Sequence, residues 1–190
     1  MKTRIIGIGN GGCNIVDDLR KINLSHEAEF VYYDYESDDL HRHGNEKDRR
    51  ILLDIEHPAD IPIADNRVDV TIVASALGGR ATTIFSRKIS LAYQQLTGIM
   101  IGVMTLPLKM EGIVQCEQAQ EMLKNLKAFY DVSIIQDNEK LPGDLNVIQM
   151  NLPLCETLET AMNKFSNGQS ANDLKALLMK EVQSQCLMIE

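Results

Sequence analysis

Short apolar runs that stop at glycine and then pass into helical spacing constrain this chain more than any other feature. Residues 4–8 (RIIGI) run into Gly9, and residues 70–74 (VTIVA) run toward Gly78 and Gly79. After each run, apolar side chains recur every three or four residues, as they do on one face of a helix. Buried strands that alternate with helices form parallel sheets covered on both faces. The sequence therefore predicts an α/β fold, a three-layer Rossmann-like domain with a mostly parallel sheet.

The same alternation extends along the whole chain. We expect strands at residues 4–8, 30–33, 51–53, 70–74, 99–104, 132–135 and 146–150. We expect helices at residues 13–22, 37–40, 84–96, 119–129, 154–165 and 174–182. Because no linker or internal repeat interrupts the pattern, residues 1–190 are expected to form a single domain. The apolar end at residues 187–189 is expected to be a frayed terminus, with a docking surface as the alternative.

The net charge limits the classes of molecule that the protein is expected to bind, and the cysteines indicate its compartment. Nineteen basic against 27 acidic residues give a net charge of -8, which argues against binding to nucleic acid or to an anionic membrane. No apolar run approaches the roughly 20 residues of a membrane span. The four cysteines form no CxxC pair, and no export signal is visible, so we expect reduced thiols in a cytoplasmic protein. A single phosphate group stays compatible with this charge, because a few backbone N–H groups can hold it.

A glycine-rich loop, GIGNGGCN at residues 7–14, joins the first predicted strand to the first predicted helix. Gly7, Gly9 and Gly12 satisfy GxGxxG, a pattern that lets a phosphate approach free N–H groups at a helix N-terminus. Asp34 follows Gly12 by 22 residues, where dinucleotide-binding folds place an acid for the ribose. The loop predicts a phosphate site, and a tight turn without a ligand is the alternative.

Two further loops follow later strands and belong to the same rim of the sheet. In SALGGRATT, Gly78 and Gly79 supply flexibility, while Thr82 and Thr83 supply hydroxyls that either contact a phosphate or cap the helix. In GVMTLPLKMEG, Glu111 either complements a helix dipole or accepts a hydrogen bond from a ribose hydroxyl. Two glycine loops on one rim suggest a nucleotide held from two sides.

Taken together, these loops resemble the N-terminal GTP-binding domain of the FtsZ/tubulin family. GNGGCN (residues 9–14) is similar to the family's glycine run ending in asparagine, and LGGRATT (residues 77–83) stands where the family has its GGGTGTG signature. Residues 102–112 are similar to the bacterial GVVTxPFxxEG segment, and IIQDN (residues 134–138) stands at the family's IPND segment. The resemblance covers about residues 3–165.

The resemblance implies a guanine-nucleotide site, with GTP or GDP as the ligand, with or without Mg²⁺. It implies that Asn14 lies near the guanine, that Glu111 meets the ribose, and that Asp137 or Asn138 meets the base edge. The first loop and the second loop would contact the phosphates. The candidate nucleotide-binding residues are therefore Gly9, Asn10, Gly11, Gly12, Asn14, Asp34, Gly78, Gly79, Arg80, Thr82, Thr83, Glu111, Asp137 and Asn138. No residue is assigned to catalysis or to a metal.

The chain also departs from the family pattern. Arg80 replaces the first threonine of the signature, where it either clamps a phosphate or pairs with a carboxylate. The family's ribose-contacting arginine corresponds to Gln115, and its acidic base-reader corresponds to Met162. The last stretch, LLMKEVQSQCLMIE, contains no counterpart of the family's catalytic acid pair, and the family's second domain does not follow. We therefore expect nucleotide binding without autonomous GTPase activity.

A metal site is not predicted at the two histidines of the HRH segment. His41 and His43 stand beside Asp38 and Asp39, but a metal needs three or four convergent ligands. We expect these residues to lie on a charged surface helix.

Three interpretations of function stay open at this point. The first is a guanine-nucleotide-binding protein that modulates a polymer or a division-related, FtsZ-like or other protein partner. The second is an NAD(P)-type dinucleotide module that uses GxGxxG and Asp34. The third is a ligand-free pseudo-GTPase scaffold for protein interaction.

Overall fold

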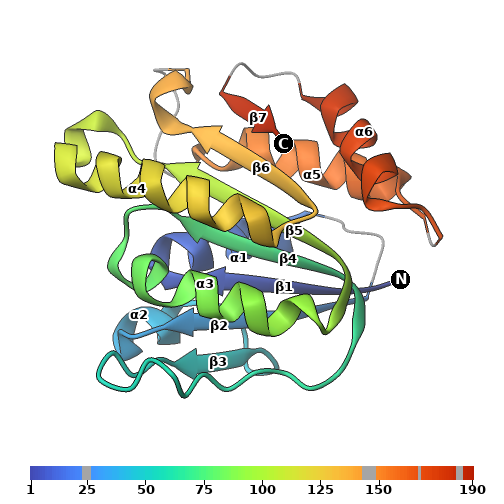
Figure 1. Cartoon of the computed structure of the whole chain (residues 1–190). Coiled ribbons are helices and arrows are strands. Elements are labelled where there is room, and N and C mark those ends of the chain that lie inside the picture. The colour runs from blue at the N-terminus through green and yellow to red at the C-terminus, as the bar shows by residue number, and fades with distance from the viewer. Residues whose placement is uncertain (23–26, 143–148, 167, 183–185) are drawn as a thin grey trace.

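The central feature of the fold is one mostly parallel sheet. The computed structural model describes residues 1–22, 27–142, 149–166, 168–182 and 186–190. Within these residues the sheet has seven strands in the order β3-β2-β1-β4-β5-β6-β7 (Figure 1). The strands are β1 (Lys2–Ile8), β2 (Glu27–Asp34), β3 (Arg49–Leu52), β4 (Val68–Ala76), β5 (Thr97–Leu106), β6 (Val132–Asp137) and β7 (Leu187–Ile189).

Helices cover both faces of this sheet. The helices are α1 (Gly9–Lys21), α2 (Ser37–Arg42), α3 (Arg80–Gln94), α4 (Ile113–Leu126), α5 (Leu152–Lys164) and α6 (Ala171–Glu181). Short 3₁₀ turns are η1 (Lys109–Glu111), η2 (Lys127–Phe129) and η3 (Asn138–Lys140). In Figure 1, α3 and α4 lie in front of the sheet, and α1, α5 and α6 lie behind it. The predicted three-layer α/β class is confirmed.

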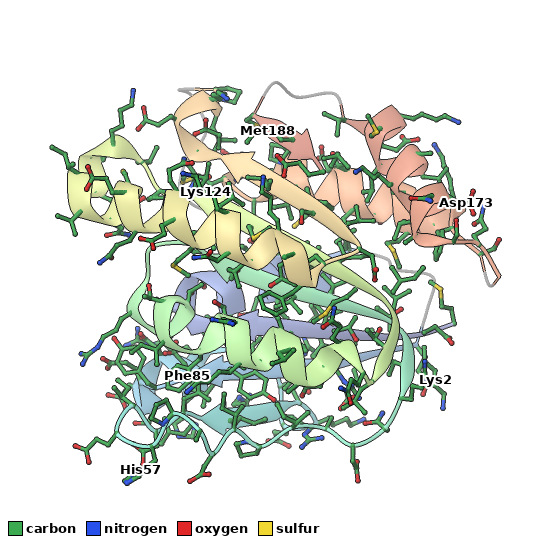
Figure 2. The ribbon with its side chains drawn as sticks, viewed as in Figure 1. Lys2, His57, Phe85, Lys124, Asp173 and Met188 are labelled. Atoms are coloured by element: carbon green, nitrogen blue, oxygen red, sulfur yellow. The ribbon has the colours of Figure 1, made fainter. Side chains whose placement is uncertain are left out.

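Two hydrophobic cores account for the three layers. Behind the sheet, Ile15 and Leu19 of α1 join Leu158 of α5 in one cluster. In front, Phe85 of α3, labelled in Figure 2, and Leu123 of α4 belong to the other. Because the central strands are buried on both faces, their sequences are nearly continuous apolar runs rather than alternating ones. Because both of their faces are buried, β1 and β4 could be predicted from the sequence.

The C-terminal residues correct one sequence expectation. Residues 187–189 are not a frayed end: they form β7, which pairs antiparallel with β6 and places Ile189 opposite Ile134. Leu187 is only 6% exposed. Three residues are too few to show a period, so the pattern did not identify this strand. The strand expected at residues 146–150 cannot be compared in full, because residues 146–148 lie outside the described part.

Helix starts also differ from the expected ones. Helix α1 begins at Gly9 rather than at residue 13, and α3 begins at Arg80 rather than at residue 84. In both cases the small or polar residues of the preceding loop adopt helical geometry before the first apolar contact with the core. As a result, residues 9–14 of the first loop and residues 80–83 of the second, both predicted to bind phosphate, lie in the first turns of helices. In the described part of the chain, no helix is long and apolar enough to cross a bilayer.

Candidate functional site

The carboxyl ends of the parallel strands meet at one rim, and a cavity of about 330 Å³ opens there. Such a volume is within the range of small-molecule sites. A second cavity of about 420 Å³ adjoins it and shares Gly11, Ala76, Thr105 and Asn138 with it. Most of the predicted residues line the first cavity, namely Gly9, Asn10, Gly11, Asp34, Gly79, Arg80, Thr82, Glu111 and Asn138.

The remaining predicted residues are placed differently. Asn14 lines the second cavity instead. Gly12 faces the backbone of β4, where an added Cβ would lie 2.5 Å from the carbonyl oxygen of Ala74. Gly78 packs against Gln115, because a Cβ there would lie 2.7 Å from the Gln115 carbonyl oxygen. These two glycines therefore allow close packing behind the cavity rather than forming its wall.

The first turn of α1 presents free backbone donors to the cavity. Gly9 begins the helix with a positive φ of 71°. The residue before it, Ile8, provides no side-chain cap, and the first turn contains no acidic residue. The first N–H groups of a helix have no partners within the helix and carry the positive end of its dipole. This end of α1 is therefore suited to an anion.

The first turn of α3 is arranged in the same way. Gly79 precedes the helix without a side-chain cap, and no acid lies in the first turn. The alternative that a threonine caps this helix is wrong: Thr82 donates to the carbonyl of Ile8 at 3.3 Å, and Thr83 donates to the carbonyl of Gly79 at 2.8 Å. The Thr82 bond also ties the second loop to the end of β1. Two uncapped helix N-termini thus converge on one cavity.

Among the described residues that line the first cavity, Arg80 is the one with a basic side chain. It is exposed, and its guanidinium lies 5.5 Å from the ring centroid of Tyr35, another lining residue. Among the described residues, Arg80 does not pair with a carboxylate, which was its alternative role. Its guanidinium contacts the ring of Tyr35 instead. The guanidinium is consequently available to a ligand.

Four carboxylates share the same wall: Asp34, Glu36, Asp39 and Glu111. Burial, reinforced by the charge of Asp39, raises the pKa of Asp34 above its ordinary value. One Asp34 oxygen accepts from the N–H of Tyr35 at 2.7 Å, and the other is buried with no hydrogen-bond partner among the described residues. Within the described ranges, however, no three carboxylate, histidine or cysteine side chains converge in a way that could hold a metal ion.

The raised pKa of Asp34 leads to a stability prediction. A carboxyl whose pKa is raised by folding stabilises the fold fully below the unfolded value of about 4, and that contribution is lost as the pH rises through the folded pKa. Asp34→Asn should therefore raise the thermal midpoint at pH 7, and the difference from wild type should shrink toward pH 4. Thermal scans from pH 4 to pH 8 measure this, with Asp65→Asn at an exposed loop position as the control. A lower midpoint for Asp34→Asn at pH 7 would contradict the prediction.

Glu111 sits in the η1 turn and is held from two sides. Its carboxylate accepts from the N–H of Leu108 at 2.8 Å and from the Nε2 of Gln115 at 2.9 Å. Glu111 and Gln115 both line the first cavity, so Gln115, which the sequence analysis expected at the position of the family's ribose-contacting arginine, faces the site. Met162, in contrast, is fully buried in the core behind the sheet and lines neither of these two cavities.

Asn138, rather than Asp137, reaches both cavities. Asp137 accepts from the N–H of Glu139 at 3.2 Å and pairs with Lys140 at 3.1 Å. Gln136 orients the Asn138 amide: its Nε2 donates to the Met150 carbonyl at 2.9 Å and to the Asn138 oxygen at 3.0 Å. Since a backbone carbonyl can only accept, both amides are fixed, and Asn138 keeps its N–H donors for a ligand.

His43 is a residue whose placement the sequence analysis missed. We expected a charged surface helix, but His43 is only 3% exposed. It follows α2 and contacts Asp17 and Asn10, which are both on α1. One feature of the sequence could have indicated this contact, namely that Asn10 is a polar side chain inside a glycine run.

Known proteins resemble this chain over part of their length. No protein-family model matches it. The cell division protein FtsZ of Mycoplasmopsis pulmonis is 27% identical over 155 residues, which cover 73% of this chain and 40% of that protein. The cell division protein FtsZ 1 of Pyrococcus furiosus is 24% identical over 155 residues, which cover 72% of this chain and 41% of that protein. The chain thus spans about 40% of the length of the curated relatives it matches.

Solved structures share the fold over nearly the whole chain. CetZ1 from Haloferax volcanii, solved as a GDP-bound monomer, has a TM-score of 0.74 at 18% identity and matches 94% of this chain and 64% of its own. The empty FtsZ dimer of M. jannaschii has a TM-score of 0.71 at 20% identity and matches 93% of this chain and 60% of its own. The structures establish the fold, and the FtsZ sequences add the homology. The chain is a homologue of the GTPase-domain part of the FtsZ/tubulin family.

Proposed function

We propose that this chain binds a guanine nucleotide at the rim of its sheet, with the phosphates against the N-termini of α1 and α3. The observation that carries the proposal is the convergence of two uncapped, acid-free helix starts on one cavity. Each contributes free N–H groups and the positive end of a dipole, which together favour a phosphate group. The GDP in the CetZ1 structure, which shares this fold, supports the same choice of ligand.

The amide of Asn138 supports guanine over adenine. With its oxygen held by Gln136, Asn138 offers N–H donors to the second cavity and the first. Guanine presents acceptors at both O6 and N7, whereas adenine presents a donor amine in place of O6. Donors on the protein therefore match guanine and oppose adenine. The ribose would then lie toward Glu111 and Gln115, whose polar atoms line the first cavity.

The charged side chains that line the first cavity affect how the phosphates of a nucleotide would bind. Four carboxylates face one arginine in the first cavity, so an unaccompanied triphosphate meets repulsion. We propose that Mg²⁺ accompanies the nucleotide and that Arg80 offsets part of the remaining charge. We further propose that the chain binds the nucleotide without hydrolysing it on its own. In this proposal the chain is a single cytoplasmic domain that modulates a filament or a division-related partner. The role in division rests on the names of the FtsZ relatives alone.

Thermal unfolding with GTP, GDP, ATP or NAD, each with and without Mg²⁺, tests the proposal. A ligand at 100 times its dissociation constant adds about 2.7 kcal/mol, which should raise the midpoint by about 5–10 °C in a chain of this size. We expect the increase with GTP or GDP and not with ATP or NAD. An increase in the midpoint with NAD alone would favour the dinucleotide interpretation. If no nucleotide raised the midpoint at millimolar concentration, the ligand-free scaffold would be favoured.

Arg80→Ala should weaken GDP binding about tenfold, because it removes the one cationic side chain that the described residues contribute to the first cavity. Titration calorimetry measures the dissociation constant directly. The matched control is Arg87→Ala, which removes the same charge from an exposed position on the same helix, α3. Equal weakening by both variants would mean that Arg80 acts only through the net charge of the protein.

A further inference from the structure

A chain of hydrogen bonds connects the interior of the protein to the first glycine loop. The Nδ1 of His43 lies 2.7 Å from one oxygen of Asp17, and its Nε2 lies 3.0 Å from the side-chain oxygen of Asn10. His43 is nearly inaccessible, whereas Asn10 is exposed and lines the first cavity. His43, the middle member of this relay, is therefore shielded from solvent, whereas Asp17 is 27% exposed and lines the second cavity, and Asn10 faces the first.

Asp17 fixes the proton on one side of the His43 ring. Its other oxygen accepts from the hydroxyl of Tyr32 at 2.8 Å and from the N–H of Gly44 at 3.1 Å. Burial opposes ionisation of Asp17, but the hydrogen bonds from His43, Tyr32 and Gly44 outweigh it and lower its pKa. Asp17 is consequently an ionised acceptor, so the Nδ1 of His43 must carry a proton.

The other ring nitrogen then has two states, and each dictates one orientation of Asn10. If Nε2 carries a proton, it donates to the Asn10 oxygen, and the Asn10 amine is left facing the cavity. If Nε2 is unprotonated, it accepts from the Asn10 amine, and the Asn10 oxygen faces the cavity instead. A phosphate accepts hydrogen bonds and repels a carbonyl oxygen. Only the first state suits a bound nucleotide.

We propose that His43 is a positioning residue that turns the donor half of Asn10 toward the nucleotide phosphate, and that nucleotide binding is coupled to uptake of a proton by His43. This inference rests on the proposed nucleotide site. Binding should tighten as the pH falls through the range in which His43 of the free protein gains its second proton. His43, which would control this equilibrium, is not among the described residues that line either of the two cavities.

The surroundings of His43 leave few other groups to produce this coupling. Besides Asp17, the ring stacks on Tyr32, with centroids 6.0 Å apart and planes at 6°. Burial raises the pKa of Tyr32 well above its usual range, so Tyr32 stays neutral near pH 7. Arg50 donates to the backbone carbonyl of His43, and Asp34 feels the histidine charge from β2. Arg20 and its partner Asp48 lie one hydrogen bond further out, through Tyr32.

A double-mutant cycle with GDP tests the positioning role. His43→Phe keeps an aromatic ring against Tyr32 but removes both hydrogen bonds, and it should weaken GDP binding about tenfold. In the Asn10→Ala background, the same substitution should change the affinity less than twofold, because the group it orients is gone. The matched control is His57→Phe, which removes an exposed histidine paired with Asp54. Equal losses in both backgrounds would overturn the proposal.

Proton uptake gives a second readout on the same proteins. Calorimetry of GDP binding in buffers of different ionisation enthalpy measures the protons taken up. Wild type should take up protons on binding near the midpoint of the His43 titration, and His43→Phe should not. Uptake that is unchanged in His43→Phe would assign it to another group and would contradict the proposal.

A ligand-free measurement separates this inference from the proposed function. Nitrogen NMR of wild-type protein follows the His43 ring and the Asn10 side-chain amide without any nucleotide or variant. Asn10 amide signals that shift with the same pH midpoint as the His43 ring support the relay even if no nucleotide binds. Asn10 signals that stay constant while His43 titrates overturn it, even if GDP binds tightly.

Discussion

Gly12→Ala is expected to lower the free energy of unfolding by about 3 kcal/mol and the thermal midpoint by about 6–12 °C. A Cβ at this position would lie 2.5 Å from the carbonyl oxygen of Ala74 and 3.2 Å from the Cα of Ser75. Both atoms belong to the backbone of β4, a central strand, so neither can rotate away as a side chain would. Helix α1 must instead move off the sheet, which loosens the packing behind the cavity.

Gly79→Ala is the matched control for this prediction. Gly79 has an ordinary φ of -72°, and the nearest atom to an added Cβ is 3.6 Å away. Its substitution should change the free energy of unfolding by no more than about 0.5 kcal/mol. Chemical denaturation of the three proteins gives the comparison. Similar losses for both variants would show that loop flexibility, and not the contact with β4, determines the cost.

Arg4→Ala is expected to lower the free energy of unfolding by about 4 kcal/mol. The Arg4 side chain is fully buried and bonds to Glu29 at 3.0 Å and to the carbonyl of Asn66 at 2.9 Å. Its guanidinium also lies 5.0 Å from the ring centroid of Tyr93. Truncation removes the hydrogen bonds, the contact with the ring and the volume of the long stem. Urea denaturation measures the loss.

Arg4→Met separates the packing of the stem from the charge. One nitrogen of Arg4 is buried and has no hydrogen-bond partner in the described part of the chain. Glu29 is 28% exposed, so its carboxylate can be solvated when Arg4 is gone. Replacing both members of a buried ion pair by apolar residues is often close to neutral, and removing one member is costly mainly where the other stays buried. We therefore expect Arg4→Met to recover more than half of the loss. A loss equal to that of Arg4→Ala would assign the stability to the ion pair instead.

The sequence predicted well those parts of the site that are local in the chain. The loops at residues 9–14 and 77–83 follow apolar strands directly, and parallel strands place their carboxyl ends on one rim. Strand order and residue spacing are therefore sufficient to bring these two loops together. Asn10 and His43 are 33 positions apart in the chain, and a contact between such distant residues produces no periodic pattern in the sequence. This is why His43 was expected on the surface.

The choice between Asp137 and Asn138 illustrates the same limit. Adjacent residues at the end of a strand point in different directions, and the sequence could not say which one faces the rim. The orientation follows from Gln136, whose amide donates to the oxygen of Asn138 and to the carbonyl of Met150, a residue that lines the second cavity. The roles of these residues toward a ligand stay predictions, since the structure places them but does not test what they bind.

The strand order also determines when the sheet can be completed during synthesis. Strand β1 lies between β2 and β4, and its Thr3 pairs with Val70, 67 residues later in the chain. A ribosome adds roughly 5–20 residues per second, so one edge of this apolar strand waits several seconds for its partner. During that interval the backbone N–H and C=O groups of β1 are open to other nascent chains. Yield in cell-free expression should therefore respond to chaperones and translation rate more than the stability of the finished protein suggests.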